Sequence, residues 1–64
     1  MGETRKLVRI IDRENDTDFI ADGSEEWARD GKDLWGAVYM LASMRGEPVG
    51  IAGVAGFPVD EDGA

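Results

Sequence analysis

The sequence predicts a small α+β domain in the order β-β-α-β, with one antiparallel or mixed sheet packed on one central helix. Residues 5–12 are rich in β-branched side chains that alternate between two faces, as in a strand. Residues 34–44 are apolar except for Gly36 and Ser43, which is typical of a helix covered on most sides. Residues 49–59 return to an alternating apolar pattern. A chain of 64 residues provides one domain, residues 1–64.

The first strand is predicted to form a hairpin with residues 18–22, through a polar turn at residues 13–17. Val8 and Ile10 share one face of this strand, and Leu7, Arg9 and Ile11 share the other. Residues 1–4 and 60–64 are expected to be disordered ends.

A helix start is predicted at Ser24, whose hydroxyl is a suitable N-cap, and a helix end at Gly46, with Pro48 beyond it. Gly31 lies inside this span and costs about 1 kcal/mol relative to alanine in a helix. We favour one helix, bent or broken near Gly31. The alternative is two helices, the second capped by Asp30.

Residues 49–59 are predicted to form one strand with a large-residue face and a smooth face. The smooth face would let the helix approach closely. The large-residue face is expected to carry Val49, Ile51, Ala55, Phe57 and Val59, with Gly53 as a gap. The smooth face is expected to carry Gly50, Ala52 and Gly56, with Val54 as the exception.

Composition excludes several classes of function. The chain has no cysteine and no histidine, so it has neither a thiolate metal site nor an imidazole base. We therefore expect no enzyme activity, no cofactor and no metal. The net charge of −7 argues against direct binding to nucleic acid. No signal peptide and no apolar stretch of about 20 residues is present, which predicts a cytoplasmic protein without a membrane span.

Two local patterns resemble ligand sites only in part. Acidic residues at every second position from Asp12 to Asp18 follow the spacing of a calcium loop. However, Thr17 and Gly23 stand where that loop requires glycine and glutamate. Glycines at every third position in residues 50–56 match neither common phosphate-binding pattern. A solvated turn and close packing explain these patterns more simply.

The apolar helix carries the predicted binding surface. One small sheet covers one side of a helix, and we expect that side to be Leu34, Val38 and Leu41. Tryptophan, tyrosine and methionine are enriched at interface cores. A chain this small without disulfides is also expected to gain stability by oligomerising. The predicted interface, against a second copy or another protein, consists of Trp35, Tyr39, Met40 and Met44.

A second candidate surface is acidic. It consists of Glu25, Glu26, Asp30 and Asp33, with the acidic residues 60–62 as a possible extension. Excess acid is also how salt-adapted proteins remain hydrated and how small apolar proteins remain soluble. Composition leaves these alternatives open.

The sequence thus predicts a non-enzymatic protein-interaction or regulatory module, a homodimer built on the apolar helix. The alternative is an inhibitor of a nucleic-acid-binding protein, whose acidic face imitates phosphates and occupies a basic groove. In its general profile the chain is similar to the small inhibitors that viruses and plasmids encode. No motif specifies a family.

Overall fold

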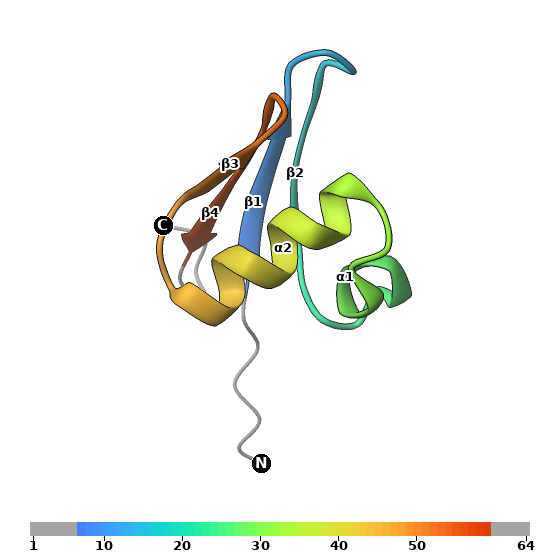
Figure 1. The fold of residues 1–64 in the computed structure, drawn as a ribbon, viewed down its shortest axis with the longest axis vertical. Coiled ribbons are helices and arrows are strands. Elements are labelled where there is room, and N and C mark those ends of the chain that lie inside the picture. The colour runs from blue at the N-terminus through green and yellow to red at the C-terminus, as the bar shows by residue number, and fades with distance from the viewer. Residues whose placement is uncertain (1–6, 60–64) are drawn as a thin grey trace.

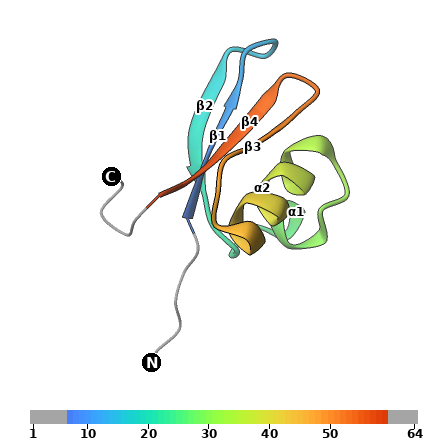
Figure 2. The same ribbon diagram turned by 60° about the vertical axis from the view of Figure 1, so that its left-hand side comes forward.

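Two antiparallel hairpins and the two helices between them make up the fold. The computed structural model describes residues 7–59. Both helices lie on the same side of the sheet (Figure 1, Figure 2). The elements in chain order are β1 (Leu7–Asp12), β2 (Thr17–Ala21), α1 (Glu26–Asp30), α2 (Leu34–Arg45), β3 (Val49–Ile51) and β4 (Val54–Val59).

The sheet has the strand order β2-β1-β4-β3, and every neighbouring pair is antiparallel. The predicted α+β class is therefore confirmed. The element order differs from the prediction, because the expected single helix is two helices and the expected last strand is a hairpin. The dimeric state stays a prediction, and the expected disordered ends, residues 1–4 and 60–64, lie outside the described residues.

The first hairpin forms as predicted. β1 and β2 pair from Val8 opposite Ala21 to Asp12 opposite Thr17. Val8 and Ile10 point toward the helices and are fully buried. The alternation of β1 places Leu7, Arg9 and Ile11 on the opposite face of the sheet.

The helical segment breaks at Gly31. This residue has φ +63° and ends α1, and its N–H donates to the carbonyl of Trp27 at 3.1 Å. The second helix is capped by Asp33, whose carboxylate accepts the N–H of Gly36 at 2.9 Å. The preference for one helix was therefore wrong, and so was Asp30 as the second cap. Ser24 is not the first cap either, because Glu25 occupies that position without a side-chain hydrogen bond.

The C-terminal hairpin turns at Ala52 and Gly53, which have φ of +49° and +88°. Positive φ at both central positions is the requirement of a type I′ turn. Because the turn has two residues, Val49 opposes Gly56 on the helix side of the sheet. Phe57 then points to the other side. The predicted grouping of Val49 with Phe57 on one face was therefore wrong.

The core lies between α2 and the two central strands. Its largest fully buried side chains are Ile10, Val8 and Val38. Gly56 permits the close approach of α2, because a Cβ at this position would lie 2.5 Å from Cγ1 of Val38. The predicted close packing of the glycine-rich segment against the helix thus holds at Gly56.

Candidate functional site

The structure separates the four residues of the predicted helix interface. Tyr39 is buried, with 6% of its surface exposed. Trp35 and Met40 are half-buried and pack against the core of the same chain. Met44 is 73% exposed. Of these four side chains, only that of Met44 remains fully available to another molecule.

The extra cover comes from α1, which the one-helix prediction did not place against α2, and from the helix side of β2. Trp27 of α1, Phe19 of β2 and Trp35 of α2 form an aromatic cluster with ring centroids 5.2 to 6.2 Å apart. The premise that the chain can cover only one side of the apolar helix was therefore wrong. Leu34, expected to face the sheet, is instead 36% exposed, while Val38 is fully buried as expected.

Asp12 is a buried carboxylate at the end of β1, with 4% of its surface exposed. Its Oδ1 accepts the backbone N–H groups of Glu14 and Asn15 at 3.1 and 3.3 Å. Its Oδ2 accepts the Asn15 amide and the Trp35 indole N–H, both at 2.8 Å. Because these donors favour the charged form, the Trp35 bond first, the pKa of Asp12 lies below its ordinary value of 3.8.

This network changes the interpretation of the acidic turn. Both oxygens of Asp12 are occupied by protein donors, so it organises the hairpin turn and anchors α2. Within residues 7–59, no group of three or more acidic side chains is placed to hold a metal ion. Nor is any helix in this part of the chain long and apolar enough to cross a membrane.

Tyr39 is the second titratable group held inside the fold. Burial raises the pKa of its phenol, and the negative charge of Asp22 raises it further. The hydroxyl lies beside the 22–24 turn, where a Cβ at Gly23 would be 3.5 Å from it. Tyr39 therefore connects α2 to the end of β2, which is a structural position.

The face of the sheet opposite the helices carries an apolar surface that the sequence expectations did not assign. We call it the outer sheet face. Ile20 and Phe57 are its most exposed apolar side chains, at 49% and 39%. They flank Arg9 on the neighbouring strands. The outer sheet face consists of Leu7, Arg9, Ile11, Asp18, Ile20, Ala55, Phe57 and Val59.

Arg9 and Asp18 are the two charged residues of the outer sheet face, and they pair with each other. The guanidinium donates to the two carboxylate oxygens at 2.9 and 2.6 Å. Through this contact Arg9 lowers the pKa of Asp18, and Asp18 raises the pKa of Arg9. Both side chains remain about half exposed. The outer sheet face is consequently apolar and carries no net charge.

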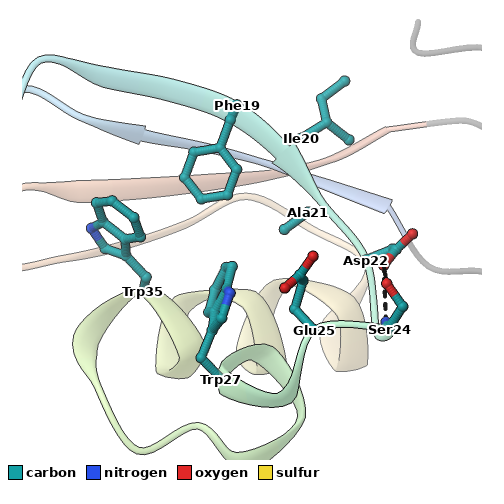
Figure 3. A pocket seen from close by; sticks show the side chains of 8 residues that line it. All are labelled: Phe19, Ile20, Ala21, Asp22, Ser24, Glu25, Trp27 and Trp35. Atoms are coloured by element: carbon teal, nitrogen blue, oxygen red, sulfur yellow. Dashed lines mark hydrogen bonds between the residues drawn. The ribbon is translucent and has the colours of Figure 1, made fainter.

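A hollow of about 400 Å³ lies under the edge strand β2. We call it the aromatic hollow. Figure 3 shows Phe19 pointing from β2 toward Trp35 and Trp27, while Ile20 points to the opposite side of the strand. The carboxylate of Glu25 lies beside Trp27 at the hollow. The residues that line it are Phe19, Ile20, Ala21, Asp22, Ser24, Glu25, Trp27 and Trp35.

A second hollow of about 390 Å³ lies near the turns at the other end of the sheet. Its polar wall includes Asp12, whose carboxylate the chain already satisfies. The wall also includes Asp33, which caps α2. These side chains have structural partners, so the aromatic hollow is the stronger candidate for a ligand.

The residues of the predicted acidic surface lie at the N-cap of α1, on α1 and at the N-cap of α2. All four of its side chains, Glu25, Glu26, Asp30 and Asp33, are exposed. Arg29 and Lys32 lie between them in the chain, so the segment has four acidic and two basic residues. The phosphate-imitating role stays a prediction, and the interspersed cations weaken it.

The sequence contains a signal for the outer sheet face in the two faces of β1. Val8 and Ile10 lie on one face of β1, and Leu7 and Ile11 lie on the other, so both faces of that strand carry apolar side chains. A strand apolar on both faces indicates a sheet covered on both faces. The aromatic hollow had no such signal, because it depends on where α1 packs.

No protein-family model matches this chain, and no curated protein or solved structure is significantly similar to it.

Proposed function

We propose that this chain is a non-enzymatic protein-interaction module that forms a homodimer through its outer sheet face. The observation that carries the proposal is the apolar character of that face. In antiparallel sheets with one solvated side, the solvated residues are normally polar. Here Ile20 and Phe57 stand exposed there, and no helix or strand within residues 7–59 covers them. Burial against a second surface would remove this apolar area from water.

Charge favours a second copy of the chain as the partner. A molecule with net charge −7 repels its own copies, so self-association is favoured at a surface with little net charge. Arg9 and Asp18 neutralise each other on the outer sheet face. The helix α1, which carries acidic residues, lies on the other side of the sheet from such a contact (Figure 2).

The geometry is also suitable for a two-fold contact. Two sheets can pack face to face about 10 Å apart with their side chains interdigitated. In a symmetric dimer the same patch contacts itself, so a neutral, apolar face is suited to self-association. The Arg9–Asp18 pairs would lie inside this contact and restrict its register.

Light scattering on the intact chain over a range of micromolar concentrations tests the proposal. We expect a dimer for the wild-type chain and a monomer for the Ile20→Thr/Phe57→Thr double variant. Threonine retains strand propensity, so the variant should keep its fold, which circular dichroism checks. The matched control is Met44→Gln, which removes an exposed apolar side chain from α2 and should leave the dimer intact.

Two results would contradict this assignment. One is a wild-type chain that remains monomeric throughout the concentration range. The other is a dimer that Met44→Gln dissociates and the double variant does not, which would return the interface to α2. Added salt should leave the dimer unchanged or strengthen it, because salt screens the repulsion between two acidic chains.

A further inference from the structure

The strand β2 has an open edge. It is first in the sheet order, and its single strand neighbour within the described part of the chain is β1. Such an edge presents a row of backbone N–H and C=O groups that another extended chain can pair with. The opposite edge, β3, is only three residues long. The longer β2 edge is therefore the better template for strand addition.

The aromatic hollow lies directly under this edge. Phe19 belongs to β2 and points into the hollow, where the rings of Trp27 and Trp35 form the rest of the aromatic wall (Figure 3). Successive side chains of a strand point to opposite faces. A residue that pairs with Phe19 from an added strand would therefore point to the same side, toward the hollow.

The chemistry of the hollow selects a cation. The faces of tryptophan and phenylalanine rings attract guanidinium and ammonium groups. Glu25 places a carboxylate beside the rings, and Asp22 adds a second negative charge to the lining. The net charge of −7 favours approach by a basic segment.

From the edge and the hollow together, we infer that β2 binds an extended segment of a partner protein, with an Arg or Lys side chain of that segment in the aromatic hollow. Backbone pairing along β2 supplies affinity, and the hollow supplies selection for a basic residue. The residues on either side of this cation would lie beside Ile20 and Asp18 on the outer side of the sheet. This inference concerns the edge of the sheet and does not rest on the proposed homodimer.

A short blocked peptide, acetyl-Thr-Val-Arg-Thr-Val-amide, is a suitable probe. The chain has two tryptophans, so the indole N–H signals of Trp27 and Trp35 report binding in an NMR titration. We expect saturable shifts of both signals. The same peptide with citrulline in place of arginine keeps the shape and loses the charge, and it should bind about tenfold more weakly.

Matched variants test the charge at the hollow. Glu25→Gln should weaken binding of the arginine peptide by about two- to fivefold, and Glu25→Lys should abolish it. The control Glu26→Gln, in the first turn of the same helix, should bind as the wild type does. Circular dichroism and amide spectra verify that each variant is folded.

A peptide with alternate backbone N–H groups methylated tests strand pairing. Methylation of the peptide N–H groups that face β2 should abolish binding. Methylation of the N–H groups that point away from β2 should leave binding unchanged. The inference would be overturned by any of three results: no binding of the arginine peptide, equal binding of the citrulline peptide, or equal binding of both methylated peptides. These readouts concern the indole and edge signals, so they are distinguishable from a failure to dimerise.

Discussion

The indole N–H of Trp35 donates a 2.8 Å hydrogen bond to the carboxylate of Asp12, joining the first turn of α2 to the end of β1. The two residues lie 23 positions apart in the chain. Asp12 also holds the β1–β2 turn through Asn15 and Glu14. One buried carboxylate therefore connects the first hairpin to the main helix.

Asp12 should make the fold sensitive to acid. Its pKa is lowered in the folded chain, so its contribution to stability is present above about pH 4 and is lost as pH falls through the folded value. Asp12→Asn places an amide N–H₂ group among donors, so we expect lower stability at neutral pH and a weaker pH dependence. Urea unfolding at several pH values between 3 and 7 measures both. The control is Glu14→Gln, an exposed position in the same turn. The prediction would be contradicted if the stability of Asp12→Asn depended on pH as steeply as that of the wild type.

Tyr39 should ionise late. It is the single tyrosine of the chain, and burial raises the pKa of its phenol above the ordinary value of 10.0. The folded state favours the neutral phenol, so Tyr39 contributes to stability below pH 10. This contribution is lost as the pH rises through the pKa that Tyr39 has in the folded state. Phenolate absorbance during an alkaline titration should give a midpoint above 10 in buffer and near 10 in urea. Equal midpoints in buffer and in urea would mean that the Tyr39 phenol is exposed to water in the folded chain, which would contradict the prediction.

Gly36 should not tolerate a methyl group. In most helices, replacing glycine with alanine stabilises by about 1 kcal/mol. Here a Cβ would collide with the backbone carbonyl of Trp27 and lie 3.0 Å from Cα of Gly31. We expect Gly36→Ala to reduce the free energy of unfolding by about 1–3 kcal/mol. Chemical denaturation measures the change.

The control for this prediction is Gly50→Ala. A Cβ at Gly50 meets no atom within 4 Å, and its φ is not positive. Its effect should remain within about 0.5 kcal/mol. A stabilising Gly36→Ala would mean that α1 does not end against the first turn of α2.

Ala52 should be improved by asparagine. Its φ of +49° lies in the left-handed region, which costs an L-residue about 1–2 kcal/mol. Asparagine tolerates this region, and Asn-Gly is the preferred pair for a type I′ turn. Ala52→Asn should raise the free energy of unfolding by about 0.5–1 kcal/mol, as a thermal melt would detect. The control Ala52→Val should be destabilising, because a β-branched residue is poorly suited to positive φ.

Local pattern was sufficient to predict the first hairpin. The β-branched side chains of β1 alternate between the two faces of the strand, and a polar turn at residues 13–17 follows. Local pattern was insufficient at Gly31, because glycine is tolerated inside a helix at a cost of about 1 kcal/mol and is also a common residue at a helix C-terminus. The structure resolves this through Gly36, which lets the end of α1 pack against α2. That contact is tertiary, so no local pattern reveals it.

The C-terminal hairpin was missed for a similar reason. Ala52-Gly53 lacks the Asn-Gly signature of a two-residue turn, so the segment was predicted as one strand. The turn determines on which face of the sheet Phe57 lies, and the one-strand prediction placed Phe57 on the same face as Val49. Asp12 was read as part of a solvated turn, because its partner Trp35 is distant in the chain.

The arrangement of the strands has a consequence for the order of folding. β1 and β4, the first and last elements within residues 7–59, are the central pair of the sheet, with Leu7 opposite Val59. During synthesis, the N-terminal hairpin therefore waits for its main neighbour until the last strand has been made. Closing such a long loop costs entropy before any contact compensates for it, so we expect folding to be slow for a chain of this length and all-or-none. Deleting residues from either end of residues 7–59 would shorten β1 or β4, which are the two central strands of the sheet, and would leave the edge strands intact.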